Sequence, residues 1–253
     1  MDVSAQPVAI VTGAGQGVGL GIATRLATDG FHVVIAARRA ETGEPAANSL
    51  RAQGLSAQCI VTDVTTRESI ANCVKETLAL YGRCDAMIHN AFAGGQASRL
   101  EETPSDVWWQ MSRTAVWASF WCAQEAFASL RQSPRGRLVF VTSPSGVEGS
   151  ANIPLYSPAK AAQRAMAKSL AREWGPHQIT VNCIAPVAET PALSNVFTQV
   201  PTLRGAIEAR TPLGRIGDPV KDIGGVVSFL LSDDAGYVSG QTIVCDGGSF
   251  LGL

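Results

Sequence analysis

Val8-Ala9-Ile10-Val11-Thr12-Gly13-Ala14-Gly15-Gln16-Gly17-Val18-Gly19 joins a short apolar, β-branched run to a glycine-rich turn. A helical pattern follows at once and continues through Thr28. Strand, glycine turn and helix in this order are typical of dinucleotide binding, because the amides and the positive dipole end of the helix face the phosphates. Gly13 permits the tight turn, Gly17 lets the backbone approach a pyrophosphate, and Gly19 allows close packing, with Gln16 and Val18 at the same site. The alternative interpretation is a glycine-rich surface turn.

Similar apolar runs bounded by turn residues recur along the chain and predict strands. They are Val8–Thr12, His32–Ala36, Ala57–Val61, Ala86–His89, Arg137–Thr142, Thr180–Ile184 and Thr242–Cys245. Helix-start signals lie between them: a capping box of Thr65 with Glu68, Thr103 with Pro104 in a first turn, Ser157–Pro158, and Asp218–Pro219. Strands alternating with helices predict an α/β fold with a doubly wound, seven-stranded parallel sheet, a Rossmann-type three-layer sandwich.

The length and composition favour one domain. With 253 residues, of which 46% are hydrophobic, the chain can bury one large core, and no linker interrupts it. We therefore expect a single dinucleotide-binding domain over residues 1–253. The only long irregular stretch is about 187–217, which Pro191, Pro201 and Pro212 interrupt. Loops of this length often cover binding sites, so we predict a substrate loop there.

The charge balance and the cysteines exclude several classes of partner. Lys and Arg number 20 against 21 Asp and Glu, so no net field gathers nucleic acid or an anionic membrane. The six cysteines form no Cys-x-x-Cys pair, which favours neither a zinc site nor a disulfide framework, and we predict no metal. Met1 to Gln6 lacks the features of a leader, and no apolar run could span a membrane. We expect a cytoplasmic protein.

Arginines follow the second predicted strand, at the place where an acidic residue would hold the ribose 2′-hydroxyl of NAD(H). The chain reads Ala37-Arg38-Arg39 there. A guanidinium can grip a 2′-phosphate that a carboxylate would repel, so Arg38 and Arg39 favour NADP(H) as the cofactor. The alternative is that both arginines are solvated surface residues, with NAD(H) as the cofactor.

Tyr156 and Lys160 stand at positions i and i+4 at the start of a predicted helix, and hence on one face of it. A phenol with an ordinary pKa of about 10 is a poor acid or base at neutral pH, and we expect the ammonium of Lys160 to lower the pKa of Tyr156. Ser143 ends the fifth strand and can donate a hydrogen bond to a carbonyl oxygen. Each residue alone has a structural explanation, but together beside the glycine turn they predict a catalytic set.

These residues resemble the short-chain dehydrogenase/reductase family over nearly the whole chain. Thr62-Asp63-Val64 is similar to the adenine-contacting motif of the family, and Asn90-Ala91 to its Asn-Ala-Gly motif. The segments Pro212–Arg215 and Ser239–Gly248 resemble the 3-oxoacyl-carrier-protein reductase-like subgroup. The resemblance implies NAD(P) chemistry on a small-molecule carbonyl or alcohol substrate, Tyr156 as acid/base, a bond from Lys160 to the nicotinamide ribose, and a homotetramer or dimer.

The chain departs from the family pattern at three places. Ala115 stands where the family has an Asn that holds a relay water, so we predict a weakened or rerouted proton relay. Pro186-Val187 replaces Pro-Gly, with Thr190 one residue early; the resemblance assigns these residues to the nicotinamide. Phe92 replaces the glycine of Asn-Ala-Gly and is expected to reshape the floor of the pocket.

Two other functions stay open. One is a lyase or dehalogenase on the same fold; such relatives lose the nucleotide loop and exchange the lysine for arginine, and neither change occurs here. The other is a dinucleotide-sensing binding protein without turnover, which only Ala115 encourages. Trp108, Trp109, Trp117 and Trp121 fall on the helix that forms a dimer interface in the family, although ordinary burial also explains them.

Overall fold

A parallel sheet organises the computed structural model, which describes residues 6–94, 99–151 and 153–250. Its strands follow the order β3-β2-β1-β4-β5-β6-β7, and every pairing is parallel. They are β1 (Val8–Thr12), β2 (His32–Ala37), β3 (Ala57–Val61), β4 (Ala86–His89), β5 (Arg137–Val141), β6 (Thr180–Pro186) and β7 (Thr242–Cys245). The prediction of a doubly wound, seven-stranded parallel sheet is confirmed.

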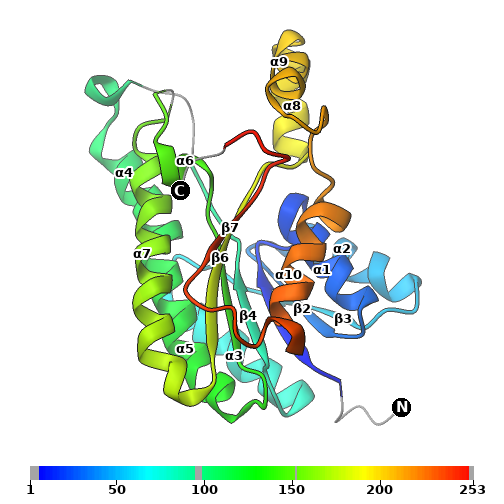
Figure 1. Ribbon diagram of the computed structural model, residues 1–253. Helices are drawn as coiled ribbons and strands as arrows, with labels where there is room; N and C mark the ends of the chain where they lie inside the picture. Colours follow the sequence, from blue (N-terminus) through cyan, green and yellow to red (C-terminus); the bar gives the residue numbers. More distant parts are fainter. Residues whose placement is uncertain (1–5, 95–98, 152, 251–253) are drawn as a thin grey trace.

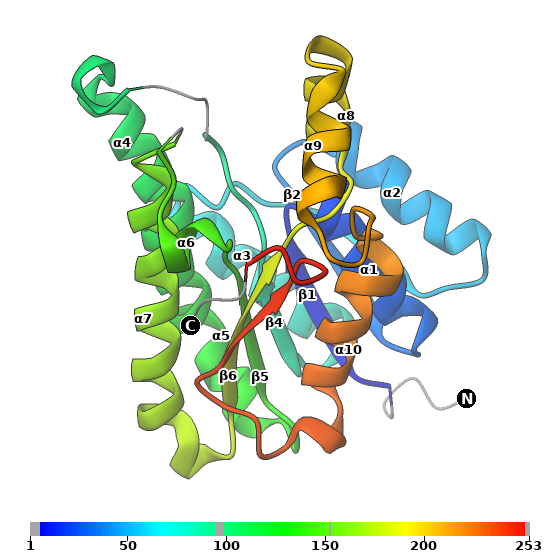
Figure 2. The same ribbon diagram turned by 45° about the horizontal axis from the view of Figure 1, so that its top comes forward.

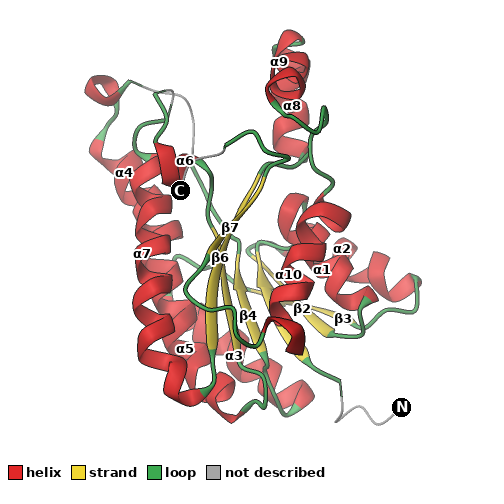
Figure 3. Cartoon of the chain, in the orientation of Figure 1, coloured by secondary structure: helices red, strands yellow, loops and turns green. Residues whose placement is uncertain are grey.

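Helices cover both faces of the sheet, which makes three layers (Figure 1; Figure 3). One face carries α1 (Gly17–Thr28), α2 (Ala40–Ala52) and α10 (Gly225–Leu231). The other carries α3 (Arg67–Tyr81), α5 (Ala118–Gln132) and α7 (Tyr156–Trp174). The shorter elements are η2 (Leu100–Glu102), α4 (Ser105–Ser112), the π-helical η3 (Arg113–Trp117), α6 (Ser145–Glu148), η4 (Gly175–His177), α8 (Pro191–Gln199), α9 (Thr202–Arg210), the π-helical η5 (Pro219–Gly224) and η6 (Asp233–Ala235).

The alternation of side chains along each strand builds two apolar cores. Val11 of β1 packs with Ile22 of α1 on one face, whereas Ile10 packs with Phe140 of β5 and Leu130 of α5 on the other. A parallel strand buried on both faces needs apolar residues at every position, which explains the nearly continuous apolar runs in the sequence.

The prediction of an irregular stretch at 187–217 is wrong, because α8 and α9 form within it. Pro191 begins α8 at a position whose amide would have no helical partner, and the Thr190 hydroxyl caps that helix by accepting from the Leu193 amide at 3.1 Å. Pro201 is the N-cap of α9, one position earlier relative to its helix. The prolines start helices here rather than break them, and both helices stand above the carboxyl ends of the strands (Figure 2).

The helix-start signals are confirmed in part. Asp218 caps the following segment, since Oδ1 accepts from the amides of Val220 and Lys221. The predicted capping box is wrong: α3 has Thr66 at its N-cap without a side-chain bond, and the Thr65 hydroxyl donates instead to Asp63 at 2.8 Å. Pro104 lies at the N-cap of α4 rather than in its first turn.

Neither a membrane-spanning helix nor a metal-binding cluster occurs among the residues that the structure describes. Among them no helix is both long and apolar enough to span a membrane. No cluster of three or more His, Cys, Asp or Glu side chains in those ranges has an arrangement that could hold a metal ion. The cysteines Cys59, Cys73, Cys84, Cys122, Cys183 and Cys245 are free thiols.

Helix α1, which begins in the glycine turn, packs so closely on η5 that a side chain at Gly21 has no space. A Cβ there would lie 2.4 Å from Cβ of Pro219 and 2.5 Å from its carbonyl oxygen. Gly205 of α9 is also inside a helix, but a Cβ there would meet nothing within 4 Å. Substitutions at these two glycines therefore distinguish the effect of helix propensity on stability from the effect of steric packing.

We predict that Gly21→Ala lowers the free energy of unfolding by about 1 to 3 kcal/mol, because the methyl group must push the Pro219 backbone away. Gly205→Ala is the matched control, and it raises stability by up to about 1 kcal/mol through helix propensity. Urea denaturation of both variants measures these changes. A stabilised Gly21→Ala would contradict the packing described here.

Candidate functional site

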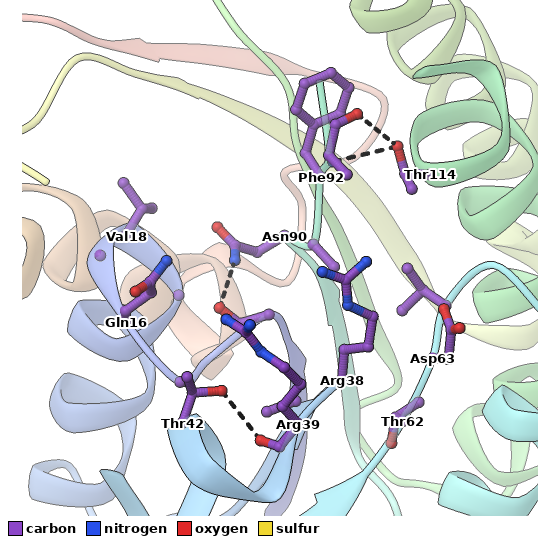
Figure 4. A pocket seen from close by; sticks show the side chains of 18 of the residues that line it. Gln16, Val18, Arg38, Arg39, Thr42, Thr62, Asp63, Asn90, Phe92 and Thr114 are labelled. Atoms are coloured by element: carbon purple, nitrogen blue, oxygen red, sulfur yellow. Dashed lines mark hydrogen bonds between the residues drawn. The ribbon is translucent and has the colours of Figure 1, made fainter. Parts of the chain in front are cut away.

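A cleft lies at the carboxyl ends of β1 to β4, where the strand order reverses between β1 and β4 (Figure 4). Ligands of doubly wound sheets bind at this switch point. The cavity has a volume of about 500 Å³, within the usual range for a small-molecule site. Its lining includes the predicted residues Gly13, Gln16, Gly17, Val18, Gly19, Arg38, Arg39, Asp63, Val64, Asn90, Ala91, Tyr156 and Thr190, and also Thr42, Phe92, Ala93 and Thr114.

The glycine turn forms one wall of the cleft. Gly13 has a φ of 66°, and a Cβ on it would lie 2.8 Å from the Cα of Ala91. A Cβ on Gly19 would lie 2.5 Å from both Nδ2 of Asn90 and the carbonyl oxygen of Gly13. Side chains at these positions would thus close the cradle or displace Asn90, so the predicted roles of Gly13 and Gly19 in turning and packing agree with the geometry.

Hydrogen bonds fix the turn to the end of β4. Asn90 Nδ2 donates to the carbonyl oxygens of Thr12 and Gly13 at 3.0 and 3.3 Å. The backbone amides of Asn90 and Ala91 both donate to the Thr12 hydroxyl at 3.0 Å. Asn90 is therefore the tie between strands that holds the glycine cradle open, and its side chain lies at the centre of the cleft (Figure 4).

His89 belongs to this junction, and the sequence analysis did not single it out. Its Nδ1 lies 3.0 Å from the Thr12 hydroxyl and its Nε2 lies 3.1 Å from the carbonyl oxygen of Thr114. Because that hydroxyl already accepts two amides, it donates to Nδ1, and Nε2–H donates to Thr114. Burial, with the nearby charge of Lys160, lowers the pKa of His89 to about 3, so the ring stays neutral. Its place directly before Asn90 was the only available signal.

Arg38 and Arg39 follow β2, as predicted, and both are exposed. Their side chains lie between Gln16 and Asp63 (Figure 4). Throughout 6–94, 99–151 and 153–250, neither guanidinium has a carboxylate partner. The Thr42 hydroxyl, also in the cleft, donates to the carbonyl oxygen of Arg39 at 3.0 Å and fixes the backbone there. Unpaired guanidinium groups beside a glycine cradle suit an anionic group of a ligand.

Asp63 and Val64 form the opposite wall. The Asp63 carboxylate accepts from the amide and the hydroxyl of Thr65, at 2.9 and 2.8 Å. The Asp63 amide donates to the Ser69 hydroxyl at 2.9 Å. Asp63 is thus a turn residue, and it also lines the cavity.

Tyr156 begins α7 and lines the cleft, and Ser143, just after β5, lies close to its phenol. Burial raises the pKa of Tyr156 above its usual value, and the nearby hydroxyl of Ser143 opposes this only in part. The phenol therefore keeps its proton at neutral pH. The structure brings these two residues together, as the strand end and helix start predicted.

Lys160 lies apart from the cleft, and the expectation that its charge lowers the pKa of Tyr156 is not met in this arrangement. Its Nζ donates to the carbonyl oxygen of Val141 at 2.8 Å and lies 5.7 Å from the centre of the Tyr156 ring. Only 3% of the residue is exposed, and burial lowers the pKa of Lys160 to about 7. Desolvation is the largest cause of the pKa shift of both groups, and the Phe92 ring, whose centre lies 4.8 Å from Nζ, packs against the ammonium.

Ala115 lies inside η3 and is fully buried. Its carbonyl oxygen accepts from the Ser119 hydroxyl at 2.6 Å and from Gln163 Nε2 at 3.5 Å. Gln163 Nε2 also donates to Ser119 at 2.8 Å, while Oε1 of Gln163 is buried with no partner among the described residues. Polar groups from α5 and α7 thus surround the place where the family keeps its asparagine, and a rerouted relay stays a prediction.

The residues after β6 divide between two cavities. Thr190 lines the cleft, and a Cβ on Gly17 would lie 3.5 Å from its methyl group. Pro186 ends β6 and does not line the cleft, and Val187 lines a neighbouring pocket instead, its amide donating to the carbonyl oxygen of Cys245 at 2.9 Å. Of these three residues, the structure brings Thr190 to the cleft.

Comparison with known proteins identifies the family. Residues 13–249 match the family model described as enoyl-(acyl carrier protein) reductase. Tropinone reductase-like 3 of Erythroxylum coca is 33% identical over 96% of this chain and 92% of its own length. Dehydrogenase/reductase SDR family member 4 of Bos taurus is 32% identical over 96% of this chain and 86% of its own length.

Solved structures show the same architecture. Actinorhodin polyketide ketoreductase with NADPH superposes with a TM-score of 0.93 at 28% identity, covering 99% of this chain and 100% of that one. A short-chain type dehydrogenase/reductase from Mycobacterium ulcerans gives a TM-score of 0.91 at 26% identity, covering 97% and 90%. The family match, the relatives and the cleft together show that this chain belongs to the short-chain dehydrogenase/reductase family of NAD(P)-dependent oxidoreductases.

Proposed function

We propose that this oxidoreductase interconverts a ketone and a secondary alcohol, with Tyr156 as the acid/base and NADP(H) as the preferred cofactor. The observation that carries the proposal is the placement of Tyr156: its phenol lines the cleft that the glycine turn forms, and the hydroxyl of Ser143 lies close to it. A bound nicotinamide dinucleotide supplies the hydride in this chemistry. The protein contributes the proton and the position of the reacting oxygen.

The cleft fits a dinucleotide at both of its ends. Gly13 and Gly19 leave a cradle that a Cβ would fill, at the start of a helix whose amides can meet a pyrophosphate. Arg38 and Arg39 supply cationic groups for a 2′-phosphate, which supports NADP(H) over NAD(H). Asp63 and Val64 line the wall opposite the glycine turn, in keeping with contacts to the adenine.

In the direction of reduction, Tyr156 donates its proton to the carbonyl oxygen, and Ser143 holds the same oxygen by a hydrogen bond. Burial raises the pKa of Tyr156, which keeps the donor protonated at neutral pH. In the reverse direction the phenolate takes the proton of the alcohol. A positive charge on Lys160 would stabilise that phenolate, and the same ammonium would hydrogen-bond to the ribose of a bound nicotinamide nucleotide.

The substrate approaches under α8 and α9, within one catalytic domain that spans residues 1–253. Phe197 of α8 is nearly buried, whereas Val196 and Val200 are 40% and 47% exposed. Apolar groups on helices above the strand ends suit a cover over an apolar carbonyl compound. The glycine turn and Lys160 are both present, which disfavours a lyase or dehalogenase, and an intact Ser143, Tyr156 and Lys160 disfavour a sensor without turnover.

The assembly and location form part of the same proposal. Trp109, Arg113, Trp117 and Trp121 line an apolar hollow of about 410 Å³ on α4, η3 and α5. Trp109 and Trp117 are 65% and 50% exposed, which is unusual for a residue as large and apolar as Trp. A second copy of this chain covers this face in a homotetramer or dimer, and the protein acts in the cytoplasm.

Replacing Tyr156 with Phe removes the proton donor and leaves the ring. We predict that turnover falls by at least about a hundredfold, while NADPH affinity stays within about threefold of the wild type, because the hydroxyl serves the proton transfer. Turnover of a ketone panel and titration by nicotinamide fluorescence measure the two quantities. Substantial turnover in the variant would rule out Tyr156 as the acid/base.

Arg38→Ala tests the cofactor preference. The variant is expected to bind NADPH about ten to a hundred times more weakly, because a charge-assisted bond to the 2′-phosphate is lost. NADH affinity should not change, which makes NADH the control ligand for the same protein. An equal loss for both nucleotides would point to damage to the fold of the cleft rather than to a 2′-phosphate site.

Trp117→Glu tests the assembly. A carboxylate in the apolar hollow opposes the burial of this face against a second copy, so the variant should dissociate into smaller species. Size-exclusion chromatography with light scattering gives the mass of each form. If the wild type is already a monomer at micromolar concentration, the oligomer proposal is wrong.

A further inference from the structure

Phe92 stands between Lys160 and the cleft. Phe92 and Tyr156 both line the cavity, whereas Lys160 does not belong to its lining. The Nζ atom of Lys160 lies 4.8 Å from the centre of the Phe92 ring and donates to the carbonyl oxygen of Val141 at 2.8 Å. The ammonium is thus turned toward β5, with an aromatic face between it and the space for a nucleotide.

A ring contact and the backbone of the next residue hold Phe92 in this place. Its edge-to-face contact with Tyr156 has a distance of 5.1 Å between ring centres and an angle of 72°. The next residue, Ala93, is tied to Thr114: its amide donates to the Thr114 hydroxyl at 3.3 Å, and that hydroxyl lies 3.2 Å from its carbonyl oxygen. Figure 4 shows Phe92 beside Thr114, at the end of the cleft away from Thr42.

In this position beside the Phe92 ring, Lys160 has fewer hydrogen-bond acceptors than it has donors. An ammonium group has three donors, and across the described ranges Val141 offers Nζ its one hydrogen-bond acceptor. The face of an aromatic ring partly replaces the missing acceptors through a cation–π interaction. Lys160 is thus a buried amine beside the cavity but outside its lining, with the ring of Phe92 against it.

We propose that Phe92 is a positioning residue that covers Lys160 in the free protein and must move aside before Lys160 can reach the ribose of a bound nicotinamide nucleotide. This proposal rests on the proposed function in one respect, the bond between Lys160 and that ribose. As a consequence, the apparent affinity for the nucleotide equals the intrinsic affinity multiplied by the fraction of molecules in which the ring has moved aside. Glycine, which the family has at this position, provides no such cover.

Chemical labelling of lysine measures, in the absence of any nucleotide, how far the Phe92 ring shields Lys160 from a reagent in solution. The other lysines, Lys75, Lys168 and Lys221, are exposed and serve as internal references. With N-hydroxysuccinimidyl acetate and peptide mass spectrometry, Lys160 of the wild type should be the slowest to react. Phe92→Ala should raise its rate about tenfold or more relative to the references, because the ring no longer covers it.

Matched variants at Phe92 distinguish shielding of Lys160 by the aromatic ring from a general loss of structure. Phe92→Tyr keeps the ring face and should label at the wild-type rate. Phe92→Leu keeps apolar bulk without the face; it should give an intermediate rate, and it replaces the alanine variant if that variant does not fold. Equal labelling of Lys160 in the wild type and the alanine variant, or in the tyrosine and alanine variants, would overturn the proposal.

NADPH titration supplies the second measurement. Phe92→Ala should bind NADPH about threefold more tightly or better, with wild-type affinity restored in Phe92→Tyr, because no ring has to be displaced. Weaker binding in the alanine variant would overturn the proposal. A wild-type protein that binds no nicotinamide nucleotide would instead overturn the proposed function, whereas the labelling comparison would still decide whether Phe92 covers Lys160.

Discussion

The junction between β1 and β4 is the constraint on which the rest of the site depends. There the Thr12 hydroxyl accepts the amides of Asn90 and Ala91 and donates to His89. His89 also connects this junction to η3, because its ring hydrogen-bonds to the Thr114 carbonyl oxygen. One buried hydroxyl thus sets the distance between the glycine turn, the end of β4 and the helix that faces Tyr156. Because Thr12, His89 and Thr114 are buried, loss of one bond of this network would leave a buried polar group unsatisfied.

Desolvation sets the charge state of the reacting groups. Burial raises the pKa of Tyr156 and lowers the pKa of Lys160 to about 7, so neither group favours its charged form in the free protein. The ring of Phe92 contributes to this state by keeping Lys160 away from the cavity. The cleft therefore holds a protonated phenol at neutral pH, which suits proton donation to a carbonyl oxygen.

Local patterns predicted the sheet well, because a strand buried on both faces must be apolar and β-branched along its length. The glycine turn and the placement of Tyr156 at a helix start were equally local. The interpretation of 187–217 failed because Pro191 and Pro201 are compatible with both a helix start and an irregular loop. The position of Lys160 could not be predicted from its spacing to Tyr156, since it depends on the tertiary contact with Phe92.

Transfer of deuterium tests the central claim, that this cleft delivers hydride to a carbonyl carbon. The protein would be incubated with NADPH deuterated at C4 on either face of the nicotinamide and with a panel of aliphatic, cyclic and aryl ketones, and the products would be analysed by mass spectrometry. The account predicts an alcohol that carries deuterium at the carbinol carbon from one of the two faces. Binding of NADPH without deuterium in any product would contradict it and would favour a nucleotide-binding protein without turnover.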